Sequence, residues 1–284
     1  MPKFGSHMSI AGGYYKAVEA AAACHCDVVQ LFTKNNNQWR AKPITDEDCR
    51  LFREALDKHG ITDPLSHASY LINLGSPDDA LRQKSIDAFA HELERAHLLG
   101  IPNVVVHPGA FTTSSEEEGI AAIIASLKSV IESTRKIETR ILLENTAGQG
   151  STLGRTFEQL AQMLDGVAKY SERVGVCIDT CHAFAAGYDI SNEAGFKAMI
   201  KSMNATFGIE RIHAIHLNDS KKPLGSRVDR HEHIGDGAIG LDGFRFVVNH
   251  AKLKKIPMYL ETEKGTDDNG RVGTRSILNA CEIW

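Results

Sequence analysis

Eight short apolar segments, rich in β-branched residues, recur along the chain and alternate with stretches of helical periodicity. They cover residues 3–9, 28–33, 64–69, 103–109, 139–146, 174–180, 211–217 and 257–263. Between them, residues 78–100 and 116–136 repeat apolar side chains at the spacing of an amphipathic helix. Alternating strands and helices indicate an α/β fold with a parallel sheet. Eight such units predict a single closed (β/α)₈ TIM barrel.

Length and composition agree with that architecture. The chain has 284 residues, of which 42% are hydrophobic and 24% charged, and one barrel needs roughly 250 residues. No linker or low-complexity tract divides it, so we expect one domain over residues 1–284. The sequence contains neither a run of ~18 apolar residues nor a signal-like N-terminus, and its six cysteines lack disulfide spacing. We therefore expect a cytoplasmic monomer that is not bound to a membrane.

Six consecutive predicted strands, the third to the eighth, each end in side chains that can bind a metal. The carboxyl ends of barrel strands are where active sites form. Taken alone, each residue is ordinarily a hydrogen-bonded or solvated side chain, but six strands in succession indicate a shared site. Such a crowd of imidazoles and carboxylates needs cations to satisfy it. The residues are His67, His107, Glu144, Asp179 and the nearby His182, His216 and Glu261.

The long segment 218–240 after the seventh predicted strand adds Asp229 and His231 to this set. On an extended segment, side chains at i and i+2 point the same way, so both can bind one cation together with His182. Nine candidate ligands suggest two or three ions, with at least one bridging carboxylate. A mixed imidazole and carboxylate set suits Zn²⁺, with Mn²⁺ or Fe²⁺ as substitutes. His233 is left out, as a neighbour of the ligands or a surface residue.

The net charge first argues against an anionic partner, and the metals reverse that argument. The formal charge is −4 with neutral histidines, and the ligand carboxylates are already counted in it. Three divalent ions would bring the total to +2 and would concentrate positive charge at the barrel mouth. Basic residues flank the same mouth, so a phosphate-rich substrate fits. These are Lys221, Lys222, Arg227 and Arg230.

Motifs in unbroken order from about residue 4 to residue 263 resemble endonuclease IV, the apurinic/apyrimidinic endonuclease family of base excision repair. GVCIDTCHAFAAGYD and GSRVDRHEHIG are the longest and most specific of them. The others include GSHMSIAGG, LFTKNNNQWR, HASYLINLGSP, VVHPGA, LLENTAGQGSTLG and LETE. The resemblance covers nearly the whole chain.

This resemblance implies a barrel that holds three zinc ions and acts on double-stranded DNA. It implies hydrolysis of the phosphodiester 5′ to an abasic site, leaving a 3′-hydroxyl and a 5′-deoxyribose phosphate, and the repair of blocked 3′ ends. Glu144 would bridge two metals and Glu261 would also orient the attacking water, so both are candidate catalytic residues. The implied groups are His67, His107 and Glu144; Glu144, Asp179, His216 and Glu261; and His182, Asp229 and His231.

The resemblance also suggests residues that contact DNA. Tyr70 and Leu71 match the positions that wedge into the groove at the lesion, although two residues that merely pack a loop would look the same. Family members often carry an arginine where this chain has Asn37, which weakens the case for a cationic side chain entering the groove there. The predicted DNA contacts are Tyr70, Leu71, Asn37, Gln38, Arg227 and Arg230.

Two other functions are compatible with part of the pattern. A sugar isomerase barrel also rings carboxylates and histidines around two metals, but it has no need of His182, Asp229, His231 and a basic loop. A non-catalytic protein that binds abasic DNA would have lost ligands, and all nine are present. Cys24 and Cys26 lack a second ligand pair, and Cys177 and Cys181 are interpreted as barrel packing.

Overall fold

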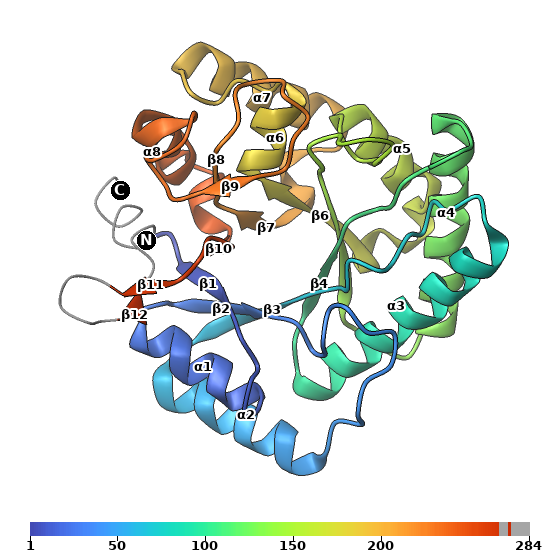
Figure 1. Ribbon diagram of the computed structural model, residues 1–284, viewed down its shortest axis with the longest axis vertical. Coiled ribbons are helices and arrows are strands. Elements are labelled where there is room, and N and C mark those ends of the chain that lie inside the picture. The colour runs from blue at the N-terminus through green and yellow to red at the C-terminus, as the bar shows by residue number, and fades with distance from the viewer. Residues whose placement is uncertain (267–271, 274–284) are drawn as a thin grey trace.

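The computed structural model describes residues 1–266 and 272–273 and contains the predicted barrel. Eight parallel strands close in the order β1-β10-β7-β6-β5-β4-β3-β2 (Figure 1). All eight predicted strands are therefore confirmed. They are β1 (Phe4–Met8), β2 (Val28–Leu31), β3 (Thr62–His67), β4 (Asn103–Val106), β5 (Arg140–Glu144), β6 (Val174–Asp179), β7 (Ile212–His216) and β10 (Met258–Leu260). Cys281 and the end of the predicted domain lie outside the described residues.

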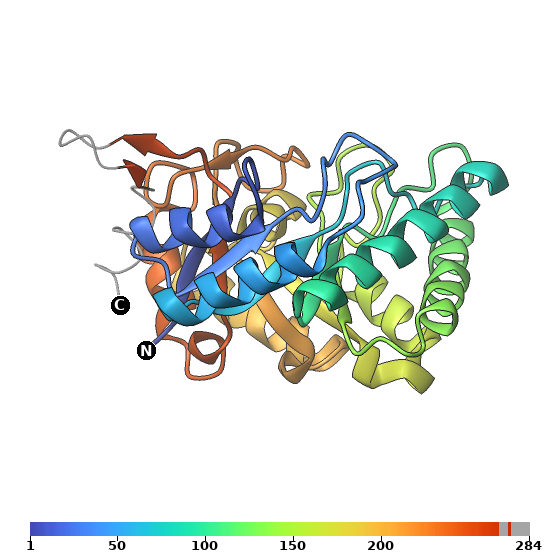
Figure 2. The same ribbon diagram turned by 90° about the horizontal axis from the view of Figure 1, so that it is seen from below.

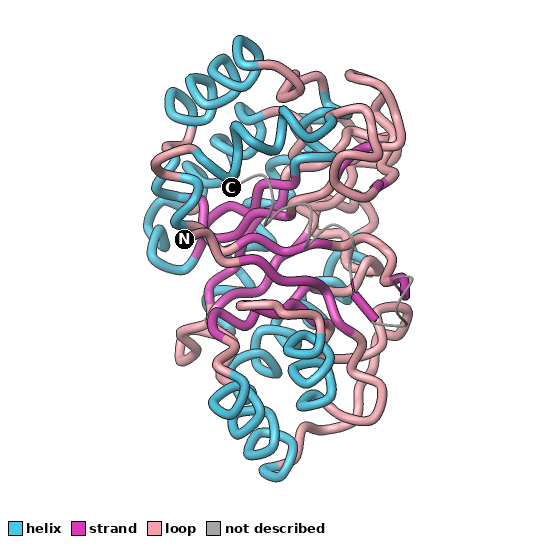
Figure 3. The backbone as a smooth tube through the Cα atoms, turned by 90° about the vertical axis from the view of Figure 1, so that its left-hand side faces the viewer, coloured by secondary structure: helices cyan, strands magenta, loops and turns pink. Residues whose placement is uncertain are grey.

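Helices cover the outside of the barrel (Figures 1 and 3). The two helices expected over residues 78–100 and 116–136 are confirmed as α3 and α4. The helices are α1 (Tyr14–Ala23), α2 (Asp46–His59), α3 (Asp79–Leu99), α4 (Glu116–Ser133), α5 (Phe157–Gly166), α6 (Thr180–Ala186), α7 (Glu193–Thr206) and α8 (Gly240–Asn249). Short 3₁₀ turns are η1 (Ala168–Arg173), η2 (Ile209–Arg211) and η3 (Leu253–Lys255).

Local sequence sets where these helices begin and end. The Ser115 side chain accepts from the backbone N–H of Glu118, and the Glu118 carboxylate accepts from the N–H of Ser115. This reciprocal cap satisfies N–H groups that have no partner inside the first turn. That cap begins α4, whereas α3 ends at Gly100, which adopts a left-handed φ of 77° that glycine tolerates and that stops the helix.

Buried side chains fill the middle of the barrel. Seven strands each contribute one buried residue to a central cluster: Val28, Leu65, Val105, Leu142, Cys177, Ala214 and Tyr259. A second, larger apolar cluster lies between the strands and the surrounding helices. Because this packing occupies the middle of the barrel, chemistry must take place at one of its ends.

The loops that follow the strands gather at one end of the barrel, the upper side in Figure 2. The segment 218–240, expected as a loop, contains two short antiparallel strands, β8 (Asp219–Ser220) and β9 (His231–Glu232). The Asp219 carboxylate accepts from backbone N–H groups of Gly235, Gly237 and Ile239 at 3.0, 3.1 and 2.9 Å. These bonds give the segment a defined shape over the barrel mouth. Two further short strands, β11 (Gly265–Thr266) and β12 (Val272–Gly273), pair antiparallel with each other.

No helix in the described part of the chain combines the length and apolar character required to cross a bilayer.

Candidate metal centre

The nine predicted ligands meet at the carboxyl end of the barrel. His67, Glu144, Asp179 and His216 are the last residues of β3, β5, β6 and β7. Asp179 and His216 are direct neighbours across β6 and β7. His107 and Glu261 follow β4 and β10, and His182 lies in the first turn of α6. Because all strands run parallel, their ends deliver these side chains to one place.

The donor atoms fall into three groups whose members lie within 4.8 Å of one another. The first two groups share Glu144, and His231 of the third lies 3.6 Å from Asp179 of the second, so the three form one continuous cluster. The first is His67, His107 and Glu144; the second is Glu144, Asp179, His216 and Glu261; the third is His182, Asp229 and His231. His233, which was left outside the predicted set, belongs to none of the groups found among the described residues.

Glu144 stands at the junction of these groups and is fully buried. Its Oε2 lies 3.2 Å from Nε2 of both His67 and His107. Its Oε1 lies 2.9 Å from His216 Nδ1 and 3.3 Å from His182 Nδ1. Each carboxylate oxygen therefore faces a different pair of imidazoles, which is the arrangement that a bridging carboxylate requires.

Mutual charge compensation dominates the electrostatics of the centre. Burial opposes ionisation of Glu144, yet the neighbouring His216 and His107 hold its pKa well below the usual range. Burial likewise opposes ionisation of Glu261, and His216 is the main group that lowers its pKa to about 2. Burial alone would lower the pKa of His182, but Asp179 and Asp229 raise it well above its ordinary value. Carboxylates and imidazoles thus stabilise each other's charged forms.

The third group joins His182 of α6 to Asp229 and His231, and His231 is the first residue of β9. His182 Nε2 is 3.0 Å from Asp229 Oδ2, and His231 Nε2 is 3.3 Å from Asp229 Oδ1. Both Nε2 atoms are buried, and neither makes an aligned hydrogen bond within the described residues. As expected for positions i and i+2, Asp229 and His231 point to the same side. A cation between these atoms would satisfy nitrogen and oxygen lone pairs together.

Cys181 approaches the same region, because its sulfur groups with Asp179 and His231. Burial raises the pKa of the Cys181 thiol to about 12, and its sulfur lies 3.6 Å from the carbonyl oxygen of Arg230. Since the thiolate is the form that binds metals, this geometry agrees with the interpretation of Cys181 as a packing residue.

Sequence reasoning missed three amides that orient the candidate ligands. Gln30 in β2 donates to Glu261 Oε1 at 2.6 Å, and its Oε1 lies 2.7 Å from His216 Nε2. Asn218 donates to Asp179 Oδ2 at 2.6 Å, and Asn145 accepts from the Asp179 N–H at 2.7 Å. Asn145 directly follows Glu144, so its position gave a usable signal. Gln30 lies in an otherwise apolar strand, and its polarity was the only signal in the sequence.

The candidate DNA contacts surround this centre. Tyr70 is 57% exposed, and its ring lies 5.3 Å from that of His67 and 5.9 Å from that of His107. Leu71 is half-buried, whereas Asn37, Gln38, Arg227 and Arg230 are exposed. All six lie on segments that follow barrel strands, so they are available to a molecule that approaches the mouth.

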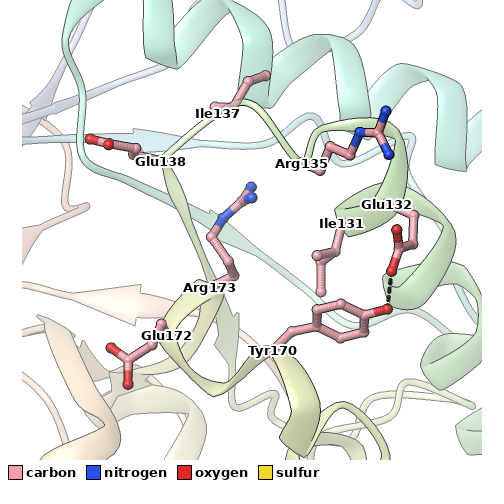
Figure 4. A pocket seen from close by; sticks show the side chains of 8 residues that line it. All are labelled: Ile131, Glu132, Arg135, Ile137, Glu138, Tyr170, Glu172 and Arg173. Atoms are coloured by element: carbon pink, nitrogen blue, oxygen red, sulfur yellow. Dashed lines mark hydrogen bonds between the residues drawn. The ribbon is translucent and has the colours of Figure 1, made fainter.

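Two hollows lie at opposite ends of the barrel. One, of about 240 Å³, adjoins the centre and is lined by His107, Thr146, Ala147, Gln149, Thr152, His182 and Asp229. The other, of about 410 Å³, is formed by the segments that precede β5 and β6 (Figure 4). There Tyr170 donates to Glu132, and Arg173 donates to the carbonyl oxygens of Thr139 and Thr134. The groups in this second hollow are engaged in holding loops together.

Comparisons with known proteins agree with this geometry. Residues 18–279 match the xylose isomerase-like TIM barrel family. A curated relative from Trichlorobacter lovleyi, named probable endonuclease 4, is 47% identical over 93% of this chain and 94% of its own. The crystal structure of endonuclease IV from Thermus thermophilus is 34% identical, with a TM-score of 0.85, and the match covers 99% of this chain and 97% of that one.

The chain belongs to the endonuclease IV family. The crystal structure of a D-tagatose 3-epimerase-like protein also matches, covering 99% of this chain and 94% of that one, with a TM-score of 0.69 at 20% identity. That likeness shows the fold alone. Family membership rests on the closer relatives, and it confirms the resemblance carried by the sequence motifs.

Proposed function

We propose that this chain is a DNA repair endonuclease that hydrolyses the phosphodiester 5′ to abasic sites in double-stranded DNA and also repairs blocked 3′ ends. The observation that carries this proposal is the nine-donor cluster with Glu144 at its junction, on a chain of the endonuclease IV family. All nine donors come from one chain, so the site is complete in a monomer.

The donor set fits zinc. Five imidazoles and four carboxylates provide nitrogen and oxygen ligands in groups of three or four, the number that zinc takes. The buried Nε2 atoms of His182 and His231, which make no aligned hydrogen bond within the described residues, favour a cation in the third group. Mn²⁺ and Fe²⁺ suit similar ligands. We expect three ions per chain, held by the three groups.

Metals bound here would supply an ionised water at neutral pH and neutralise phosphate charge. Within the protein, Glu144 would hold the first two groups at a fixed separation. Glu261, which approaches His216 at 3.3 Å and is held by Gln30, would orient the attacking water. Asp229 and His231, carried by the 218–240 segment, would close the third group beside the leaving oxygen.

DNA would be bound around this mouth. Tyr70, exposed beside His67 and His107, would stack against the duplex at the lesion, with Leu71 supporting it. Asn37 and Gln38 would approach from the segment after β2. Arg227 and Arg230 would contact phosphates, which position the duplex without reading its sequence.

A single preparation can test the activity and the metals together. Elemental analysis of purified protein should return two to three transition-metal ions per chain. The same protein should cut a duplex that contains one tetrahydrofuran abasic analogue, at the phosphodiester immediately 5′ to the analogue, and should leave the intact duplex uncut. This activity should survive brief treatment with EDTA. Protein that contains only magnesium, or that cuts both duplexes equally, would contradict the proposal. Activity on a ketose without DNA cleavage would indicate a sugar isomerase instead.

A further inference from the structure

A buried ion pair lies away from the metal centre, between helix α3 and the segment that follows β2. Lys34 Nζ is 3.1 Å from Glu92 Oε1, and the two side chains are 2% and 1% exposed. Removing two charges from water costs more than a buried pair commonly regains. Stability alone is therefore a poor reason for this pair, and its other contacts indicate what it does.

Those contacts join two separate loops. Lys34 Nζ also donates to the Gln38 carbonyl oxygen at 2.7 Å, within the loop after β2. Glu92 Oε1 also accepts from the Ser69 N–H at 3.0 Å, within the loop after β3. The Ser69 hydroxyl in turn donates to the carbonyl oxygen of Asn36. The buried pair thus ties both loops to each other and to α3, which carries Glu92.

Arg95, one turn further along α3, extends the same arrangement. It is 3% exposed and donates to the carbonyl oxygens of Thr33 at 2.6 Å and Lys42 at 2.7 Å. Residues three apart lie on one helix face, so Glu92 and Arg95 together hold both ends of the loop after β2. A loop held by buried charges at several points has little freedom to rearrange.

We propose that the Lys34–Glu92 pair positions the loops that follow β2 and β3, which carry the proposed DNA contacts, and thereby determines how tightly the protein binds abasic DNA relative to intact DNA. The inference rests on the proposed function. Lys34 and Glu92 are positioning residues, because they act through the Gln38 carbonyl and the Ser69 N–H. Tyr70 and Leu71 directly follow Ser69, and Asn37 directly precedes Gln38. Loops ordered before binding avoid the entropy cost of being ordered by the ligand.

The test is a double substitution, Lys34→Met with Glu92→Met. It removes both charges of the pair together, so neither Lys34 nor Glu92 leaves its partner's charge buried alone, yet the Ser69 N–H and the Gln38 carbonyl lose their side-chain partners. The matched control is Lys16→Met with Glu19→Met, which removes an exposed ion pair of 2.8 Å on α1. Binding to abasic and intact duplexes is measured by fluorescence anisotropy, and metal content and thermal unfolding are measured alongside.

The double variant should keep its fold, its metals and its single-turnover rate at saturating abasic duplex. Its dissociation constant for that duplex should rise about tenfold, the effect of ordering a few side chains on binding. Affinity for intact duplex should not change, and the control should match the parent throughout. A role in stability alone would not separate the two duplexes.

Parent protein that fails to cut abasic duplex would refute the proposed function, whatever the variants do. If the parent cuts and the double variant binds abasic duplex equally well, or loses affinity for both duplexes alike, the positioning role is wrong. Should the double variant fail to fold, Glu92→Gln decides. Combined with Lys34→Met, it leaves neither charge of the pair buried alone, keeps an acceptor for the Ser69 N–H and removes the Lys34 contact with Gln38. An unchanged ratio of the two affinities in this variant would overturn the inference.

Discussion

Glu144 is the residue on which the site depends most, since its two oxygens face four imidazoles within 3.3 Å. Replacing Glu144 by Gln removes one charge and one oxygen while keeping the size. We expect turnover on abasic duplex to fall by several orders of magnitude, while abasic DNA still binds. Glu261→Gln should behave similarly, because Glu261 contacts the same His216.

Steady-state and single-turnover cleavage would measure this loss, with Glu138→Gln as the control. Glu138 is exposed and lies beside the hollow at the other end of the barrel, so that variant should match the parent. If Glu144→Gln or Glu261→Gln retained more than about a tenth of the parental turnover, a barrier change below about 1.4 kcal/mol, its catalytic role would have to be withdrawn.

Gln30 contributes through orientation rather than contact with substrate. Its amide nitrogen donates to the Glu261 carboxylate, which can only accept, so its oxygen is the atom that faces His216 Nε2. In the neutral imidazole that would bind a metal, the proton of His216 would then sit on Nε2, and the Nδ1 lone pair would be available to the ion. Such partners of metal ligands typically change metal affinity 10- to 100-fold.

We accordingly expect Gln30→Leu to weaken metal retention by about 10- to 100-fold without unfolding the barrel. Competition with a chelator of known affinity would measure it. Gln83→Leu, at an exposed position on α3, serves as the control for the loss of an amide. Equal retention by parent and Gln30→Leu would show that His216 finds its orientation without this residue.

The limits of prediction from sequence are clearest at these residues. The strand-end donors could be located because parallel strands deliver their last side chains to one end, whatever the details of packing. Their role as ligands stays a prediction. Gln30 could not be found in the same way, since its importance comes from partners 186 and 231 residues away. No local pattern encodes contacts of that range.

At the scale of elements, the segment between β7 and α8 differs most from expectation. Strands β8 and β9 have only two residues each, too few for periodicity to reveal. The Asp219 carboxylate organises the segment through backbone N–H groups up to 21 residues away. By contrast, α3 and α4 were predictable because their apolar spacing and their capping residues are local.

Among the three proposed metal groups, Asp229 and His231 from this segment belong to the third alone. Asp229→Ala should therefore remove one metal ion and leave two, because the first two groups draw on other elements. His233→Ala should remove none. Elemental analysis of both variants beside the parent gives the answer, and equal loss from the two would mean that the wrong histidine was assigned.

At the scale of the whole molecule, the barrel mouth sets the charge that an approaching duplex meets. The chain carries a formal −4, which repels phosphates, and three divalent ions would bring it to +2. Catalysis, DNA attraction and charge compensation would then depend on the same ions. Removal of the metals should therefore affect stability as well as activity, with a dependence on pH that can be worked out.

In metal-free protein, burial lowers the pKa of His67, His182 and His216, but neighbouring carboxylates, and for His216 first of all Cys177, raise it above the ordinary value. A raised pKa in the folded state stabilises the protein below the unfolded histidine value, about 6.5, and this contribution is lost as pH rises through the folded values. Metal binding has the opposite pH dependence, because it requires deprotonated imidazoles and strengthens as pH rises.

The difference in melting temperature between metal-loaded and metal-free protein should therefore widen from about pH 6 to pH 8. Calorimetry on both forms across this range would measure it, and other titrating groups cancel in the difference. A gap that narrows with rising pH would mean that these histidines do not exchange protons for metal.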